Sequence, residues 1–256
     1  MKERKCDLSL IIYELRNING NLFVHFFGII FPILLSIVLS KAIGDQVPKE
    51  ASQEAVTTVM LTMTLVMPMS IMLIGYGALY SQEVERGIPM RMYLFGLGEK
   101  SIMMAKIIAH LIFLTIAFVV FGVFQFLFMD IQKPALSSFF CLVISLYLLG
   151  ILFLILAHAI SNIFKKFGIT FGIVMFLYFI FMILSGMMGV RMEQLPEGMQ
   201  KIAKTLPMSY ISNDFIEFWQ GGSYNFMPFI QSFIFLGAVS GILLLYSLYK
   251  NRRVVK

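Results

Sequence analysis

A cluster of charged residues lies between two long apolar stretches of this sequence. Its members are Glu83, Glu85, Arg86 and Arg91. Gly87 and Pro89 lie among these charges, and proline is favoured in the first turn of a helix. The apolar residues that follow are Met90, Met92, Tyr93, Leu94 and Phe95. We therefore expect a short helix whose apolar side chains must be covered by lipid or by another protein. The alternative is a plain charged hairpin between two helices.

The segment that follows, residues 96–101 (GLGEKS), superficially resembles a phosphate-binding loop. Such a loop needs glycine directly before Lys-Ser or Lys-Thr, between a strand and a helix. Here Glu99 precedes Lys100, and the surroundings predict helices. We therefore do not expect this chain to bind ATP or another cofactor itself.

The three histidines, His25, His110 and His158, lie in or at the edge of apolar stretches. A hydrogen bond between helices or at the membrane interface is the expected role of each. A proton relay would need a carboxylate partner within the membrane, and the apolar stretches contain no Asp or Glu. Cys6 and Cys141 lie far apart, and no Cys/His cluster has the spacing of metal ligands. We expect no catalytic residue and no metal site.

The composition places most of the chain in a membrane. Its 256 residues are 59% hydrophobic and 13% charged, against about 45–50% and about 25% in a soluble domain. A hydrocarbon core of about 30 Å needs roughly 20 apolar helical residues. Six stretches qualify, at about 21–40, 56–80, 102–129, 136–160, 168–190 and 226–249. Because all six must pack together, we predict an all-α membrane protein with one membrane domain over 21–256. Lys106, just inside the third stretch, is expected to reach toward the headgroups.

The basic residues predict the orientation. With both termini on one side, that side carries fourteen of the 20 Lys and Arg residues. The other side carries six, namely Lys41, Lys49, Lys133, Arg191, Lys201 and Lys204. Cytoplasmic loops carry the excess of Lys and Arg, so both termini are predicted to be cytoplasmic. The net charge of +6 then reflects this bias, and no nucleic-acid partner is expected.

Two segments outside the spans have helical patterns. In residues 1–20, the apolar residues Leu8, Ile11, Ile12 and Leu15 predict an amphipathic helix on the inner membrane surface; an ordinary helix leading into the first span is the alternative. In the outer loop, residues 191–225, Leu195, Met199, Ile202 and Leu206 form a second stripe. Together with the aromatic residues up to Trp219, this stripe predicts two short helices bent back into the outer interface. The alternative is a solvated loop.

Small and flexible residues mark two further sites. Gly168 and Gly172 are four residues apart, which lets two helices approach closely, within the chain or between two chains. In the second span, Met60, Thr64 and Met67 combine hydroxyl and flexible thioether side chains, which suit a path for varied apolar molecules. Methionine is also an ordinary filler of cores, so plain packing is the alternative.

At this point a family resemblance can be stated. Six spans with both ends inside, and an E-x-E-x-G segment at residues 83–87, resemble the type 2 permeases of ATP-binding cassette exporters. Lys106 lies where members of that family carry a lysine. In the loop before the sixth span, Gly186, Leu195-Pro196 and Leu206-Pro207-x-x-Tyr210 are similar to the family's G…LP…P-x-x-Y pattern. The resemblance covers essentially the whole chain. It departs at Ile88-Pro89, where members often carry Gly-Thr-Leu.

The resemblance implies a coupling helix around 84–97 that docks on a separate ATPase subunit, which binds the ATP and Mg²⁺. The implied coupling residues are Glu83, Glu85, Arg86, Gly87, Met90, Arg91, Tyr93, Leu94 and Phe95. It also implies a second permease chain, identical or related, that pairs through the first and fifth spans, with Gly168 and Gly172 as contacts. It further implies a substrate route near the second and fifth spans, where Met60, Thr64 and Met67 are the candidates. With this resemblance, we expect the chain in a plasma membrane of bacterial type. The outer helices between spans five and six are implied to be re-entrant.

The spans contain no fixed charges for a strongly ionic cargo, so we expect an amphipathic one: a drug, an antimicrobial peptide or a lipid-like molecule. Two rival functions remain open. A membrane enzyme would need His, Asp or Glu clustered at one membrane depth. An immunity or sensor protein would bind its ligand without moving it. Co-purification with an ATPase would distinguish a transporter from both rivals.

Overall fold

The computed structural model describes residues 6–44, 48–188 and 192–254, and the regular elements in these ranges are all helices. The first three spans and the segments around them are α1 (Leu8–Asn19), α2 (Leu22–His25), η1 (Phe26–Ile30), α3 (Phe31–Gly44), α4 (Lys49–Pro68), η2 (Met69–Gly75), α5 (Tyr76–Glu85), α6 (Ile88–Leu94) and α7 (Glu99–Phe128). The remainder are α8 (Leu136–Phe164), α9 (Phe167–Leu184), η3 (Met192–Gln194), α10 (Glu197–Ala203), α11 (Pro207–Asn213), α12 (Phe215–Trp219) and α13 (Phe226–Val254). Of the basic residues counted above, Lys2, Arg4, Lys5, Arg191 and Lys256 lie outside the described residues.

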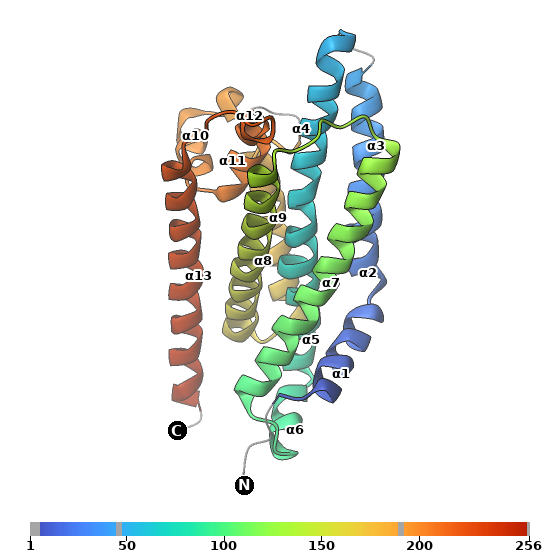
Figure 1. Cartoon of the computed structure of the whole chain (residues 1–256). Coiled ribbons are helices and arrows are strands. Elements are labelled where there is room, and N and C mark those ends of the chain that lie inside the picture. The colour runs from blue at the N-terminus through green and yellow to red at the C-terminus, as the bar shows by residue number, and fades with distance from the viewer. Residues whose placement is uncertain (1–5, 45–47, 189–191, 255–256) are drawn as a thin grey trace.

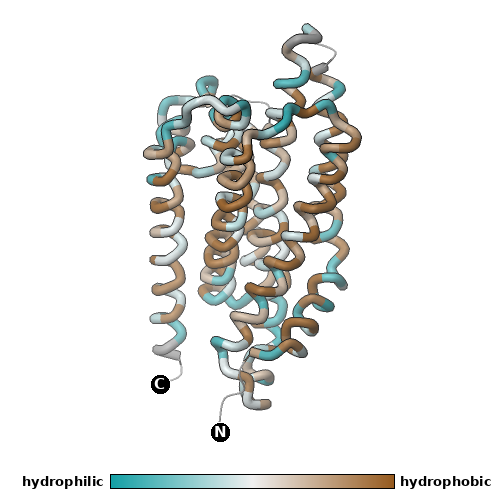
Figure 2. The backbone as a smooth tube through the Cα atoms, in the orientation of Figure 1, coloured by the Kyte–Doolittle hydropathy of each residue, from teal (hydrophilic) through white to brown (hydrophobic). Residues whose placement is uncertain are grey.

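Within the described residues, six helical stretches are long and apolar enough to cross a membrane, which agrees with the predicted number of spans. They are Leu22–Ile43, Ala51–Glu85, Glu99–Phe128, Leu136–Phe164, Phe167–Leu184 and Phe226–Asn251. Figure 1 shows them side by side along one long axis, with α6 and α1 at one end and α10, α11 and α12 at the other. We call these the α6 end and the α12 end. Hydrophobic residues run along the middle of the bundle, and hydrophilic residues gather toward its two ends (Figure 2).

The second span, formed by α4, η2 and α5, is the central helix of the bundle. In its most apolar stretch 89% of the residues are buried, against 22–44% in the other five spans. Pro68 ends α4 and has no N–H to donate to the preceding turn, and the π-helix η2 begins directly after it. This span continues to Glu85, five residues past the predicted end at 80. The extension adds Glu83 and Glu85 to this span, whereas the predicted stretch, residues 56–80, contains no acidic residue.

The first two spans pack closely at two glycines, Gly28 of η1 against η2 and Gly75 of η2 against α2. A Cβ atom added at Gly28 would lie 2.6 Å from Cγ1 of Ile71, and one added at Gly75 would lie 2.8 Å from Cγ2 of Val24. Real Cβ contacts are not this short, so only glycine permits this approach of the first two spans.

The fifth span ends earlier than predicted, at Leu184 rather than near 190. Gly186 adopts a positive φ of 77°, and the Met187 N–H donates to the Met182 carbonyl, a cap that ends a helix. Ser209 of α11 donates to the Leu184 carbonyl, and Ser212 donates to the Ser185 carbonyl. The start of the outer segment is thus tied to the end of the span.

The outer segment contains three short α-helices, where two were predicted. Of the predicted stripe, Leu195 and Leu206 are buried, whereas Met199 and Ile202 are exposed. Trp219 is buried in the protein, and its Nε1–H donates to the Gln132 carbonyl at 2.9 Å. The segment is therefore a packed cap over the ends of the spans and not a solvated loop.

Helix α1 is amphipathic, and the face that it turns toward the bundle is a different one from the apolar stripe predicted to lie on the membrane surface. Asp7 caps it by accepting from the Leu10 N–H at 2.9 Å. Its buried residues are Leu10, Glu14 and Ile18, whereas Leu8 and Ile12 of the predicted stripe are exposed. The reason is an ion pair, described next, that turns Glu14 into the bundle.

Candidate functional site

Helix α6 projects from the α6 end with none of its residues buried. Gly87 precedes it at a positive φ of 67°, which glycine adopts without the steric cost that other residues incur. Pro89 lies in its first turn, as predicted. The apolar side chains of α6 and its C-cap are 58–78% exposed, namely Met90, Tyr93, Leu94 and Phe95. This chain therefore leaves an apolar surface of α6 uncovered.

Arg91 lies in α6, and Glu85 and Arg86 lie just before it. Arg91 Nη2 donates to the Arg86 carbonyl at 2.6 Å, across the turn that opens the helix. Glu85 is exposed at the end of α5, and its Oε2 accepts from the Phe167 N–H at 2.9 Å. A carboxylate satisfies the free N–H groups at a helix start and interacts favourably with the helix dipole. Glu85 thereby joins the end of the second span to the start of the fifth.

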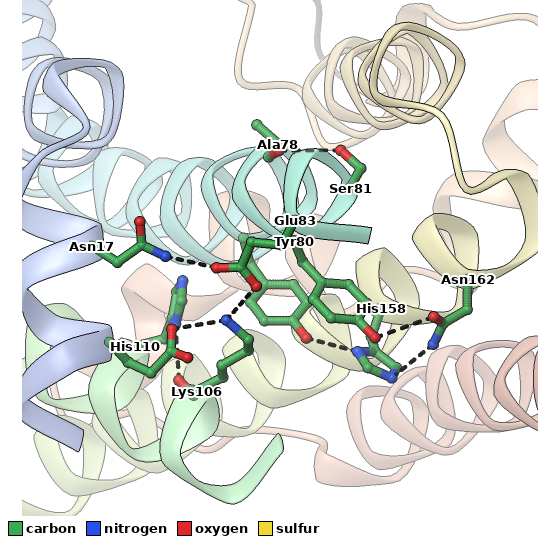
Figure 3. A network of polar contacts seen from close by, with 11 residues as sticks. Asn17, Ala78, Tyr80, Ser81, Glu83, Lys106, His110, His158 and Asn162 are labelled. Atoms are coloured by element: carbon green, nitrogen blue, oxygen red, sulfur yellow. Dashed lines mark hydrogen bonds and ion pairs between the residues drawn. The ribbon is translucent and has the colours of Figure 1, made fainter. Parts of the chain in front are cut away.

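Glu83, two residues earlier, points the opposite way, into the bundle (Figure 3). Its Oε2 lies 2.7 Å from Lys106 Nζ, and its Oε1 accepts from Asn17 Nδ2 at 2.7 Å. Lys106 Nζ also lies 2.8 Å from Glu14 Oε2. The three charged side chains are only 1–7% exposed. We call Glu14, Asn17, Glu83 and Lys106 the charge cluster; it joins α1, α5 and α7.

The charge cluster corrects two predictions. Lys106 was expected to reach toward the headgroups, but its ammonium group points inward, because two carboxylates are available there to compensate for its lost hydration. Glu83 was grouped with the coupling residues on one surface, whereas its buried carboxylate does not lie on the surface that α6 presents.

The two carboxylates share one ammonium group in a buried site. Burial raises the pKa of the Glu14 carboxyl above its ordinary value, and the charge of Glu83 raises it further. The charge and hydrogen bond of Lys106 act in the opposite direction. Loss of Lys106 would leave both acids buried without a cation.

A second polar network continues from the charge cluster toward α8. Tyr76 Oη lies 2.7 Å from His158 Nδ1, and Asn162 Nδ2 lies 2.9 Å from His158 Nε2. The Tyr80 hydroxyl donates to Asn162 Oδ1 at 3.1 Å. The Tyr80 ring stacks on the His158 ring, and Lys106 Nζ lies 5.9 Å from the centre of the Tyr80 ring. Figure 3 shows how this network and the charge cluster adjoin.

The histidines behave in two ways. His158 makes the predicted hydrogen bonds, including one between helices. His25 does so too, since its Nε2 lies 3.2 Å from the carbonyl of Asn19, the last residue of α1. His110 Nδ1 instead lies 2.8 Å from the Lys106 carbonyl of its own helix.

The remaining predicted residues lie apart from this end or on another face. Met60, Thr64 and Met67 are buried in α4, and the Thr64 hydroxyl donates to the Leu61 carbonyl. Gly168 and Gly172 are exposed on α9, and a Cβ atom added at either would meet no described atom within 4 Å. Close packing within this chain is therefore not their role.

The sequence analysis did not single out Glu14, Asn17, Tyr80 or Asn162. One signal was present for Glu14, since it lies between Leu10 and Ile18 at the four-residue spacing of one helical face. A single acid in an apolar stripe indicates a buried partner. Nothing local identified the other three residues.

The comparison with protein families agrees with this arrangement. The sequence matches the family model described as ABC-2 type transporter over residues 8–215, which is most of the chain. That range includes α6, the charge cluster and five of the six spans. A search among curated proteins gives no match. The chain therefore belongs to the ABC-2 type transporter family, and the matched residues form its membrane permease, a transport subunit distinct from the ATPase domain.

Proposed function

We propose that this chain is the permease subunit of an exporter driven by separate ATP-binding cassette subunits, which bind ATP and Mg²⁺ and dock on α6. The observation that supports this proposal is the uncovered apolar surface of α6. Exposed apolar area costs about 25 cal/mol per Å², and clusters of this kind mark binding sites. Aromatic and apolar side chains held on a short rigid helix are typical interface anchors. Arg86 and Arg91 beside them would orient the partner through charge.

The contacts of α6 with the rest of the chain would allow its movement to be passed to other helices. The Arg86 and Gly87 N–H groups donate to the Gln82 and Val84 carbonyls, so α6 follows the last turn of α5 directly. The charge cluster joins α5 to α1 and α7, and Glu85 joins it to α9. A displacement of α6 would thus move four helices together, which is how a packed bundle passes between two arrangements.

In this proposal the α6 end is cytoplasmic and the α12 end faces outward, with the protein in a bacterial plasma membrane. A second permease chain, identical or related, would pair through the face of α9 that carries Gly168 and Gly172. The cargo would be amphipathic, a drug, an antimicrobial peptide or a lipid-like molecule. Because Met60, Thr64 and Met67 are buried, they would line its path only after the spans rearrange.

The test compares two surface variants. One carries Tyr93→Ser, Leu94→Ser and Phe95→Ser on α6, and the matched control carries Met199→Ser and Ile202→Ser on α10, which are exposed apolar residues at the opposite end. The permease is co-expressed with the candidate ATPase, and the amount that co-purifies and its ATP turnover in vesicles are measured. We expect the α6 variant to lose at least about tenfold in bound ATPase, or about 1.4 kcal/mol, and the control to retain it.

An α6 variant that keeps the complex would refute docking at this helix. A complex that forms normally but moves no amphipathic probe across vesicles would instead favour a sensor or immunity protein. The pair Glu85→Ala and Arg86→Ala should also weaken ATPase association without preventing membrane insertion. That pair additionally removes the Glu85 contact to Phe167, so it is the less specific of the two tests.

A further inference from the structure

A groove of 630 Å³ lies between α8 and α13, on a different side of the protein from α6 and the charge cluster. Its walls are almost wholly apolar. The principal lining residues are Phe140, Ile144 and Leu148 of α8 and Phe226, Ile230 and Ile234 of α13. Most of these side chains are exposed rather than packed against their own chain. The volume is within the range of about 300–1,000 Å³ that holds small ligands in proteins.

The position of the groove indicates what surrounds it. Both helices begin at the α12 end, and the lining residues lie in 137–152 of α8 and 226–234 of α13. Residue 152 is about 24 Å along α8 from its start, at 1.5 Å per residue. Since α8 and α13 are two of the spans, the groove lies along the hydrocarbon core, which is about 30 Å thick. The medium at its open side is therefore lipid and not water.

The groove is elongated, because its lining runs along α8 from Ser137 to Leu152, and we call it the slot. Beside Leu152 the two helices are in contact, since a Cβ atom added at Gly237 of α13 would lie 3.6 Å from Leu152 Cδ2. The lining contains no charged residue, and its polar groups are limited to Ser137, Cys141 and Ser145. These walls offer dispersion contacts along the whole groove but no ionic partner. If the groove were empty, its lining residues would lose those contacts.

We propose that this slot holds one acyl chain of a bilayer phospholipid. A saturated or singly unsaturated hydrocarbon chain is long, thin and uncharged, and it can enter sideways from the leaflet at the α12 end. The inference does not depend on the exporter proposal, because the groove does not involve α6, the charge cluster or an ATPase.

The experiment uses the full chain in vesicles of phosphatidylethanolamine and phosphatidylglycerol that contain a small fraction of phospholipid with a diazirine on one acyl chain. After irradiation, the labelled residues are located by mass spectrometry. The reference surface is the face of α7 that carries Ile116, Val119 and Val123, which are exposed to a similar degree. We expect the groove residues to be labelled about tenfold more than this face, which corresponds to a preference of about 1.4 kcal/mol.

Two filling variants and one matched control connect the label to the groove. Ile144→Trp fills the slot from α8 and Ile230→Trp fills it from α13, so either one carries the test if the other fails to fold. Val119→Trp adds the same side chain on α7 outside the slot. We expect each filling variant to bring groove labelling down to the level of α7, with no change in the control.

Equal labelling of the groove and α7 in the unmodified chain would mean ordinary lipid contact only and would overturn the proposal. Groove labelling that persists in both filling variants would do the same. Efficient oxidative cross-linking of Cys141 to Cys141 between two chains, in a Cys6→Ser background, would show that a second copy covers the slot instead.

Discussion

Glu83 and the residues of α6 belong to one short segment, yet they lie in opposite environments. Glu83 is buried and paired with Lys106, while Tyr93 and Leu94, about ten residues on, are largely exposed. Glu83 and Glu85 differ as well, because residues two apart on an α-helix are rotated by about 200°. One carboxylate of an E-x-E pair therefore faces the bundle when the other faces away. The motif thus has an inner half that anchors α5 and an outer half that is available to a partner.

The largest expected effect comes from breaking the inner half. Lys106→Met should leave the carboxylates of Glu14 and Glu83 buried without a cation, at a cost of about 3–5 kcal/mol. Thermal unfolding in detergent, followed by the fluorescence of the single tryptophan Trp219, should show a clearly lower Tm. Lys166→Met, which removes an exposed lysine, is the control and should change Tm little. Equal Tm values for the two variants would mean that the charge cluster does not anchor α5.

The next effect tests how rigidly the inner side of the second span is held. Gly75→Ala would place a Cβ atom 2.8 Å from Val24 Cγ2 and 3.2 Å from the Ser70 carbonyl oxygen. Overpacking of this kind costs about 1–3 kcal/mol, and the same unfolding measurement should detect it. Gly172→Ala, where no described atom lies within 4 Å, should be neutral or stabilising by up to about 1 kcal/mol. A neutral Gly75→Ala would show that the first two spans separate easily.

A smaller effect concerns pH. Because burial and then Glu83 raise the pKa of the Glu14 carboxyl above 4.5, the folded protein takes up a proton before the unfolded chain does. The stability contributed by this proton is fully present below pH 4.5 and is lost as the pH rises through the raised pKa. Other titratable groups near Glu14 are Lys106, Glu83 and Tyr13, and burial raises the pKa of the Tyr13 hydroxyl.

Glu14→Gln should remove this contribution. Between about pH 7 and about pH 5, the gain in Tm on acidification should be smaller in the variant than in the unmodified chain. Tyr13→Phe serves as the control and should leave the pH dependence unchanged. An identical pH response in Glu14→Gln would mean that Glu14 stays ionised throughout this range.

The smallest effect on stability is expected in the outer half. The α6 variant with serine at 93, 94 and 95 removes side chains that touch little of this chain. Its free energy of unfolding should therefore change by no more than about 0.5 kcal/mol. The same variant is expected to lose its ATPase. A large fall in Tm would show that α6 supports the fold and would make the binding loss uninformative.

The sequence predicted what depends on local composition. Runs of about twenty apolar residues placed the spans, because a bilayer leaves few alternatives to a helix. Pro89 after Gly87 predicted the short helix that became α6. The span ends were less accurate, since Gly186 and the caps donated by Ser209 and Ser212 stop α9 early, and those partners lie more than twenty residues away in the chain.

By itself, the sequence determined that this is a helical membrane protein with six spans and a short charged helix between the second and third. Hydrophobicity and helix-breaking residues act over a few neighbours and are visible in one dimension. Only the tertiary structure decided that Glu14, Glu83 and Lys106 meet, that Asn162 and His158 join α8 to α5, and that α8 and α13 leave a groove. These features depend on which face of each helix turns inward, and that is decided by partners distant in the chain.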